Sequence, residues 1–412
     1  MRLSTATAVP FSSPVEPTQL RPFQGGYLQL EKRDLVLLRV ETADGEVGHA
    51  PVPLWRSAAE DHFEDEPARA YADLFETAVA DAVESIDLDS PDDLATAVRD
   101  LDLPPGIESE VTAALDVAYH DIRGKRAGAP VYELLTDREV DPEPIELEGS
   151  AGLYLDPDGY GTQASALRVR GFETYTFRSA GPPDDDLDSL RKIRDRTDEE
   201  LGIVTDAHTW WKLGPNSYDE QQVADLLSEM AAYDPKRVQD PIEPTDTEAY
   251  ERLLAETEVP IAAGRSAATP SALRDLLETG VDYLVGDVCR HGGFTSCWDL
   301  VGSCAERDTQ FLPHSFGTRL ETVANAHLAA AAPGTVPLEY PAFGRAVADA
   351  HPFPLADDLL ATDFDVSDGT LTMPESPGLG VEVDESVVEE YPYVEGTAAE
   401  YVLVESPDAD AD

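Results

Sequence analysis

From about Ile145 to Tyr340, short apolar segments alternate with amphipathic helical patterns, and this alternation restricts the fold more than any other feature. Each of the eight apolar segments has the length and composition of a strand. They are IELEGSAG, YTFR, GIVTD, RVQD, VPIAAG, YLVGD, QFLPH and VPLEY. Repeated βα units of similar length favour a closed parallel barrel over an open doubly wound sheet. We therefore predict an α/β fold built on a TIM-type barrel.

A polar or charged residue closes each of the later strands. These residues are Asp206, Gln239, Arg265, Asp287, His314 and Glu339. Because all strands of such a barrel end at the same face, residues at different strand ends converge on one pocket. We expect these side chains to meet and to form the functional site.

The residues before the barrel mix strand and helix patterns. A strand near residues 3–9 is expected to lead into a Pro- and Gly-rich loop that ends at Gly26, and Asp44-Gly45 predicts a hairpin turn because this pair tolerates positive φ. Helical patterns follow at residues 66–85, 91–101 and 107–126. We predict an α+β domain at residues 1–138 and the barrel at 139–349. Residues 350–404 are expected to return to the first domain, and residues 405–412 to form an acidic disordered tail.

The chain is strongly acidic, with 83 Asp plus Glu against 29 Lys plus Arg and a formal net charge of −54. The hydrophobic fraction of 42% is that of a packed protein, so the acidity does not indicate disorder. So negative a chain excludes nucleic acid and anionic membranes as partners, because both require clustered basic residues. Acidity spread along the whole chain is typical of a halophilic protein from an acidic proteome, in which salt screens the self-repulsion.

The cysteines and the chain start bear on the cellular compartment. Cys289, Cys297 and Cys304 have no CxxC spacing and fit reduced structural thiols. No apolar run has the length of a membrane span, and no apolar segment follows a basic one at the start. We predict a cytoplasmic protein.

Several motifs resemble those of the enolase superfamily, in its mandelate racemase and muconate lactonizing enzyme group and within that the acid-sugar dehydratase branch. They are AALDVAYHDIRGKRAGAPVYELL before the barrel, GFETYTFR, TDAHTWW, DVCRHGG, FLPHSFGT and LEY. The resemblance extends over nearly the whole chain. It implies an N-terminal α+β capping domain over a modified (β/α)7β barrel, which agrees with the pattern of predicted strands and helices.

The resemblance also implies a chemistry. Members of the family bind a carboxylate substrate to Mg2+ and remove the proton α to the carboxylate, and the divalent charge stabilises the enediolate. On this basis His314 and Asp287 form the basic dyad and Glu339 hydrogen-bonds the intermediate. The alternative for His314 and Asp287 is a structural hydrogen bond in the barrel mouth. Asp206 stands at the first metal-ligand position, and Arg178 is the retained half of a KxK or KxR pair.

Three positions depart from the family pattern. Gln239 and Arg265 stand where the family has its second and third carboxylate ligands, and Thr176 replaces the first Lys of the pair. Hard divalent cations need several anionic oxygens, and a guanidinium repels them, so we predict no tight Mg2+ site. Asp240 and Glu243 lie near the fourth strand, but their use as ligands would require a register change.

The candidate substrate-binding residues are His208, Trp210, Arg265 and Thr176. The cap segments near residues 19–27 and 51–55 are expected to select the substrate. An alternative for Arg265 is a buried salt bridge with Asp206 that replaces the metal without catalysis. Two-base racemisation is not expected, because Lys212 lies beyond the third strand and the remaining lysines are outside the barrel strands.

Two hypotheses for function remain open. In the first, the protein is a hydro-lyase that dehydrates an acid sugar, with His314 as the base. Arg265 and Arg178 would then replace some of the metal's charge, or Mg2+ would bind weakly through Asp206, Gln239 and a substrate oxygen. In the second, it is a catalytically impaired paralogue that binds a sugar acid or assembles with an active homologue. The replaced ligand positions favour the second, whereas the retained dyad and Glu339 favour the first. In either case the expected partner is a small carboxylate or sugar acid, and the resemblance implies a homo-oligomer.

Overall fold

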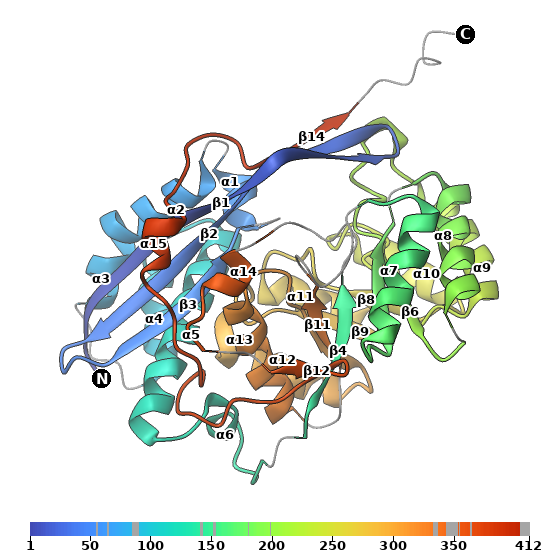
Figure 1. Ribbon diagram of the computed structural model, residues 1–412. Coiled ribbons are helices and arrows are strands. Elements are labelled where there is room, and N and C mark those ends of the chain that lie inside the picture. The colour runs from blue at the N-terminus through green and yellow to red at the C-terminus, as the bar shows by residue number, and fades with distance from the viewer. Residues whose placement is uncertain are drawn as a thin grey trace.

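The computed structural model shows a sheet-and-helix cap beside a parallel barrel (Figure 1). The described residues are 1–54, 57–63, 66–84, 90–140, 143–150, 154–179, 181–197, 199–332, 337–342, 353, 355–362 and 365–403. The predicted tail at residues 405–412 lies outside them. No helix in these ranges is long and apolar enough to cross a membrane.

The cap is an antiparallel sheet covered by helices. Its strands are β1 (Leu3–Phe23), β2 (Gly26–Thr42), β3 (Val47–Pro53) and β14 (Ala399–Leu403). Its helices are α1 (Ala58–His62), α2 (Pro67–Leu74), α3 (Ala80–Glu84), α4 (Pro91–Arg99), α5 (Pro105–Ala127) and α6 (Val131–Leu134), with a π-helical turn at Phe75–Val79. The hairpin predicted at Asp44-Gly45 joins β2 to β3.

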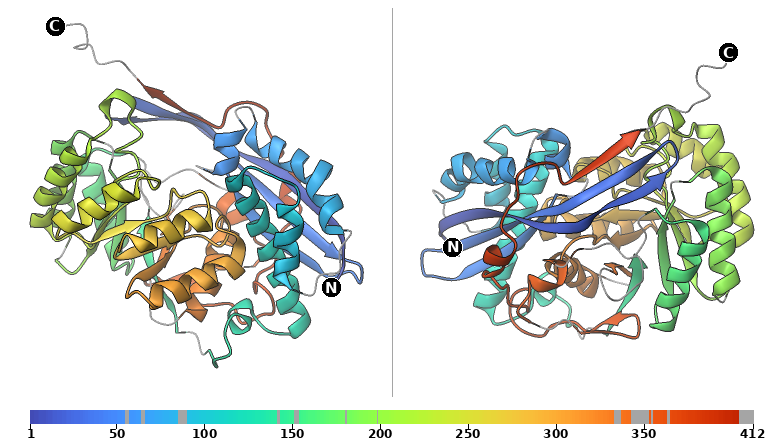
Figure 2. Two further views of the ribbon diagram at one scale, coloured as in Figure 1. Left: turned by 180° about the vertical axis from the view of Figure 1, so that it is seen from behind. Right: turned by 45° about the horizontal axis from the view of Figure 1, so that its top comes forward.

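The prediction of a loop before Gly26 is wrong, because those residues continue β1 as far as Phe23 and pair with β2. Pro14 and Pro17 lie where the register shifts, between Pro14 and Gln19, whereas Pro10 and Pro22 stay paired with β2. The long β1–β2 hairpin extends across the barrel (Figures 1 and 2). At its tip Gly25 approaches Asn216 so closely that a Cβ would lie 2.1 Å from the Asn216 Nδ2.

The barrel has eight parallel strands in the order β10-β9-β8-β7-β6-β5-β4-β11. They are β4 (Ile145–Ser150), β5 (Thr174–Arg178), β6 (Gly202–Asp206), β7 (Arg237–Gln239), β8 (Ile261–Ala263), β9 (Tyr283–Gly286), β10 (Gln310–Pro313) and β11 (Leu338–Pro341). β10 and β11 lie next to each other and complete the ring. The strands are buried along most of their length because helices cover the outside of the sheet.

Seven helices follow the first seven strands and give the predicted (β/α)7β order. They are α7 (Pro157–Val169), α8 (Pro183–Arg196), α9 (Glu220–Met230), α10 (Thr247–Glu256), α11 (Pro270–Glu278), α12 (Gly293–Ala305) and α13 (Arg319–Ala331). Side chains cap several N-termini, as when Thr318 accepts the backbone N–H of Glu321. The fold predicted from the sequence is confirmed.

The C-terminal segment runs back from the barrel to the cap (Figure 2). It contains α14 (Leu355–Asp358), the strands β12 (Val366–Ser367) and β13 (Thr370–Leu371), and α15 (Val387–Glu390). β13 pairs with the start of β4, and β14 pairs with β2. We propose the domain boundaries 1–138 and 139–349, with 350–404 returning to the cap.

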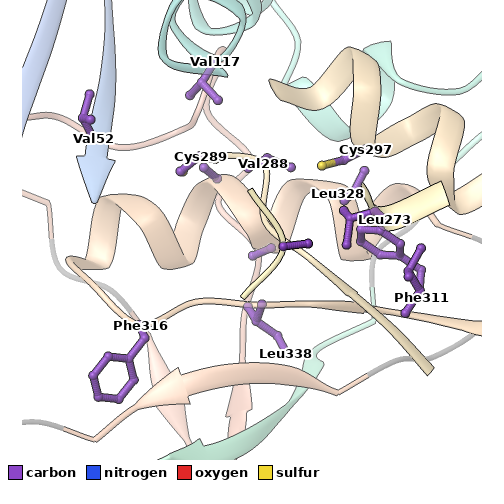
Figure 3. Close-up of a cluster of buried hydrophobic side chains, with 14 of the residues drawn as sticks. Val52, Val117, Leu273, Val288, Cys289, Cys297, Phe311, Phe316, Leu328 and Leu338 are labelled. Atoms are coloured by element: carbon purple, nitrogen blue, oxygen red, sulfur yellow. The ribbon is translucent and has the colours of Figure 1, made fainter. Parts of the chain in front are cut away.

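One apolar core extends across the seam between cap and barrel. Figure 3 shows Val52 of β3 and Val117 of α5 beside Val288 and Leu338 of the barrel. Cys289, Cys297 and Cys304 are buried free thiols, and all three belong to this core. Figure 3 labels the first two. The continuous core fixes the cap over the C-terminal ends of the barrel strands.

Candidate active site

The residues expected to meet all lie at the C-terminal ends of barrel strands. Asp206 and Gln239 end β6 and β7, while Arg265, Asp287 and His314 follow β8, β9 and β10 within two residues. Glu339 lies in β11. All six side chains are buried, with relative exposures from 0% for Asp287 to 9% for Glu339. The barrel mouth is therefore a closed, polar interior beneath the cap.

His314 and Asp287 form a hydrogen-bonded dyad. The His314 Nδ1 lies 3.0 Å from the Asp287 Oδ2. The other carboxylate oxygen accepts hydrogen bonds of 2.8 Å from the Asn325 side chain and from the backbone N–H of Cys289. Burial raises the pKa of Asp287, but the hydrogen bond from His314 and the charge of Arg290 outweigh it and bring the value to about 2. The carboxylate is thus ionised and rigidly held.

This dyad determines the tautomer of His314. Its Nδ1–H donates to the acceptor-only carboxylate of Asp287, so the Nε2 carries the lone pair. The Nε of Arg265 donates to that Nε2 over 3.1 Å, and the Glu339 Oε2 lies 3.5 Å from the same atom. The basic atom of His314 is therefore directed at the two residues that face it across the barrel mouth.

Asp206 is held by two other groups. The Arg178 Nε lies 3.4 Å from its Oδ2, and the His208 Nδ1 lies 2.6 Å from its Oδ1. Burial would raise the pKa of Asp206, but His208 and the charges of Arg265 and Arg178 hold it well below its ordinary value. The predicted alternative, a salt bridge between Asp206 and Arg265, is wrong. Asp206 forms its ion pair with Arg178, and Arg265 donates a hydrogen bond to His314.

His208 presents a second histidine nitrogen to the barrel mouth. Burial and the nearby charges of Arg265 and Arg178 hold its pKa well below the ordinary value, so the imidazole is neutral. Its Nδ1–H donates to Asp206 and its Nε2 is a lone-pair acceptor. That Nε2 is buried without a hydrogen-bond partner among the described residues. A buried acceptor of this kind fits a ligand hydroxyl group.

The other two residues expected to bind substrate make contacts of a different kind. The Thr176 hydroxyl donates to Glu148 of β4, which also pairs with Arg237 at 2.5 Å. Trp210 is fully buried, donates its indole N–H to the Ser179 Oγ over 2.7 Å and packs against Tyr218. A role for either in binding substrate stays a prediction.

The family's metal-ligand positions do not form a site for Mg2+. Asp206 is the one carboxylate among them, beside an amide at Gln239 and a guanidinium at Arg265, and octahedral Mg2+ requires more anionic oxygen. Asp240 instead holds the loop that carries Arg265, because its two oxygens accept the backbone N–H groups of Gly264 and Ser266 at 2.8 and 2.9 Å. Glu243 is exposed.

A second group of potential ligands is Asp287, His314 and Glu321, whose nearest ligand atoms lie within 4.8 Å of one another. Hydrogen bonds within the protein already engage Asp287, His314 and one carboxyl oxygen of Glu321. The Glu321 Oε1 accepts the N–H of Phe316 over 2.9 Å. Burial and the charge of Asp287 raise the pKa of Glu321 to about 8, so it holds a proton at neutral pH. Asp287 therefore bonds the His314 ring, while Glu321 holds the backbone of Phe316 beside this pair.

The sequence pattern missed several residues that support the site. Glu321 and Asn325 lie four residues apart on the buried face of α13. The pattern of residues that close strands does not include them, because they belong to a helix. Arg33 comes from β2 of the cap and is buried. Burial and the charge of Arg178 lower the pKa of Arg33 well below its ordinary value, so a residue of the cap lies within electrostatic reach of Arg178.

A small cavity marks where cap and barrel meet beside the site. It has a volume of about 30 Å³ and is lined by Arg33, Pro53, Phe316, Glu321 and Phe353, among others. Phe316 follows His314 by two residues. The cavity therefore lies close to the dyad, on the side that faces the cap.

Comparisons with known proteins identify the family. Residues 11–136 match the mandelate racemase / muconate lactonizing enzyme N-terminal domain, and residues 159–387 match the enolase C-terminal domain-like family. The chain is 24% identical to a D-gluconate dehydratase of Thermoproteus tenax, over 86% of this chain and 69% of that protein. It is also 24% identical to a D-galactarolactone cycloisomerase of Agrobacterium fabrum, over 90% and 94% of the two chains.

A solved structure of an enolase superfamily member from Polaromonas sp. JS666 superposes with a TM-score of 0.79 at 26% identity. The superposition covers 97% of this chain and 99% of that one. The two family matches together include most of the chain, and the motifs quoted from the barrel lie within them. The chain therefore belongs to the enolase superfamily, in the branch that contains the acid-sugar dehydratases.

Proposed function

We propose that the protein is a hydro-lyase that dehydrates an acid sugar. The observation that carries this proposal is the dyad of His314 and Asp287, whose Nε2 accepts a hydrogen bond from Arg265 and faces Glu339 in a buried barrel mouth. Such a dyad removes a proton from carbon, and the similarity to a D-gluconate dehydratase supports a substrate with a hydroxyl group next to that carbon.

The first step is removal of the proton α to the substrate carboxylate. The His314 Nε2 takes the proton, and the C–H electron pair forms a C=C bond as one carboxylate oxygen gains charge. Asp287 stabilises the resulting imidazolium and keeps the ring in its orientation. Its pKa of about 2 keeps it ionised throughout.

The second step expels the β-hydroxyl group. The electron pair returns from the enediolate, the β C–O bond breaks, and the His314 imidazolium returns its proton to the departing oxygen. The products are water and an enol, and His314 is again neutral. The enol then tautomerises to a 2-oxo-3-deoxy acid. Atoms and charge balance without a co-reactant.

Glu339 supports the intermediate as a hydrogen-bond donor. Burial is the main cause that raises its pKa, so it retains a proton to higher pH than an exposed glutamate. A protonated carboxyl can donate to the charged oxygen of the enediolate, as a carboxylate cannot. His208, with its buried acceptor Nε2, would orient a sugar hydroxyl group, and Arg178 lies next to it on Asp206.

Members of the superfamily generally use Mg2+, which supplies positive charge to the enediolate. The residues at the family ligand positions here do not fit that ion, so no step above depends on it. The predicted homo-oligomer stays a proposal, which light scattering at high salt can test.

The second candidate is a paralogue that binds a sugar acid without turning it over. The replacement of two carboxylate positions by Gln239 and Arg265 favours it. Both candidates use the same pocket, and they differ in whether His314 exchanges a proton with the bound acid.

A screen of acid sugars for 2-oxo acid formation at high salt tests the proposal. Turnover by the parent and its loss in His314→Asn are expected. His49→Asn is the matched control, because His49 bonds Glu385 in the cap, away from the dyad. Equal turnover by the parent and His314→Asn would remove His314 as the base. Binding of sugar acids without turnover of any of them would favour the second candidate.

A further inference from the structure

Arg265 is held in the barrel mouth by its own loop. The N–H groups of the residues on either side, Gly264 and Ser266, donate to the two oxygens of Asp240 at 2.8 and 2.9 Å. Gly264 has a φ of 127°, and a Cβ at this position would lie 2.5 Å from the carbonyl oxygen of Val285. Only glycine fits there, so the backbone that presents Arg265 is specifically built.

The guanidinium of Arg265 lies among buried charges of both signs, with Asp206 and Glu339 on one side of the balance and Arg178 and Arg290 on the other. Arg178 bonds Asp206 at 3.4 Å, and Arg265 is close enough to both for their charges to act on it. Burial and the charge of Arg178 lower the pKa of Arg265, while Asp206 opposes them. Arg265 and Arg178 thus bring two guanidinium groups to the same part of the barrel mouth. A carboxylate ligand at this point would gain two cationic neighbours.

We propose that Arg265 and Arg178 form a carboxylate-binding site that takes the place of the divalent metal, so that the protein binds its substrate without Mg2+. This inference rests on the proposed function for its catalytic consequence, although the binding site itself does not. A guanidinium matches a carboxylate through two parallel hydrogen bonds, and its charge is permanent. A guanidinium directed at the oxygen that gains charge in the enediolate stabilises this intermediate electrostatically.

The contact between Arg265 and His314 links binding to activation of the base. In the structure the Arg265 Nε donates to the His314 Nε2, so the lone pair of the base is occupied. A charge-assisted hydrogen bond to a carboxylate is stronger than one to a neutral imidazole. A bound carboxylate therefore draws the guanidinium away from His314. The base becomes free only when the substrate carboxylate is in place.

Calorimetric titration with oxalate tests the site apart from turnover. Oxalate is a planar dianion that resembles the enediolate, and EDTA removes any divalent metal. We expect oxalate to bind with the same affinity in EDTA and in added Mg2+. Arg265→Gln should weaken binding at least ~10-fold, and Arg265→Lys should recover part of the loss because it keeps the charge but not the two parallel donors.

Arg274→Gln is the matched control, since Arg274 is a half-exposed arginine of α11 that pairs with Asp299. It should bind oxalate like the parent, and circular dichroism should show that each variant is folded. The inference is overturned if the parent binds no oxalate, if binding in EDTA is lost and Mg2+ restores it, or if a folded Arg265→Gln binds normally.

These results separate the inference from the proposed function. Metal-independent oxalate binding through Arg265 without dehydration of any acid sugar supports the site and contradicts the hydro-lyase. Dehydration that EDTA abolishes and Mg2+ restores supports the hydro-lyase and contradicts the site.

Discussion

The Nε of Arg265 lies 3.1 Å from the Nε2 of His314, so a guanidinium at a family metal-ligand position touches the candidate base directly. Asp206, the carboxylate that remains among the ligand positions, is paired with Arg178. The residues that replace the metal ligands and the residues of the dyad are therefore in direct contact. Whether the protein is a hydro-lyase or only binds a sugar acid depends on this contact.

Restoring the two missing carboxylates should create a metal site. The parent is expected to show no tight Mg2+ binding by calorimetry at high salt. Arg265→Glu combined with Gln239→Glu should bind Mg2+, because with Asp206 it supplies three anionic ligands at neighbouring strand ends. Gln239→Glu alone keeps the guanidinium and should not bind. Tight Mg2+ binding by the unmodified protein would contradict our account of the site.

Asp287→Asn should lower turnover by roughly 10²-fold or more, because an amide neither stabilises the imidazolium nor fixes the tautomer of His314. The measurement is the rate of α-proton exchange in D2O, followed by NMR. Asp121→Asn is the control, since Asp121 is a buried carboxylate of the cap that accepts the N–H of His49 at 3.1 Å. It should cost stability and leave the exchange rate of the folded protein unchanged. Unaltered exchange in Asp287→Asn would show that the dyad does not act as a unit.

Asp240→Asn should weaken the site through the loop that carries Arg265. The amide replaces one acceptor oxygen by a donor, so one of the bonds from Gly264 and Ser266 is lost, at about 1 kcal/mol or more. We expect weaker oxalate binding as well as lower stability. Asp282→Asn removes a similar bond at the opposite end of β8, where Asp282 accepts the N–H of Ile261 at 2.8 Å. The control should lower the unfolding temperature but keep the oxalate affinity. Equal affinities in both variants would exclude a positioning role for Asp240.

Glu110 should make the cap–barrel seam sensitive to pH. It accepts the N–H groups of Ala58 and Ala59 at 2.7 and 3.1 Å, and burial is the main cause that raises its pKa from 4.5 to about 7. The native state then holds the proton more tightly than the unfolded chain. Its contribution to stability is fully present below about pH 4.5 and is lost as the pH rises through about 7.

Glu110→Gln should remove this dependence, which is on the order of 3 kcal/mol in the free energy of unfolding. The measurement is chemical denaturation of parent and variant across that pH range at fixed salt. Glu108→Gln, on the same helix but half-exposed, should keep the parent's slope. If the free energy of unfolding fell equally with rising pH in the parent and in Glu110→Gln, other groups would be the cause of the pH dependence.

The unfolding temperature should rise with KCl concentration. A formal charge of −54 repels itself over distances that salt shortens, from about 10 Å at 0.1 M to about 3 Å at 1 M. Differential scanning calorimetry across that range tests the halophilic interpretation. Sucrose at matched water activity is the control for effects unrelated to charge. An unfolding temperature independent of KCl would contradict it.

The sequence determined the barrel and the places where its site residues stand. Strand and helix periodicity is a local property, and the parallel topology sends every strand end to one face. His314, Asp287, Glu339 and Asp206 were therefore found from their positions alone, and the family motifs agree with them. The long β1 strand was missed because its prolines resemble a loop, and pairing with β2 overrides that local preference.

Tertiary structure decided which of these side chains touch. Spacing along the chain brings Arg265 to the mouth but does not say whether it reaches Asp206 or His314, since that depends on distances across the barrel and on the loop held by Asp240. Supporting groups such as Asn325 lie on the buried face of a helix. The sequence pattern there predicts only core packing and gives no sign of the hydrogen bond from Asn325 to Asp287. Local patterns fix the backbone path, whereas side-chain partners are chosen by packing among segments far apart in sequence.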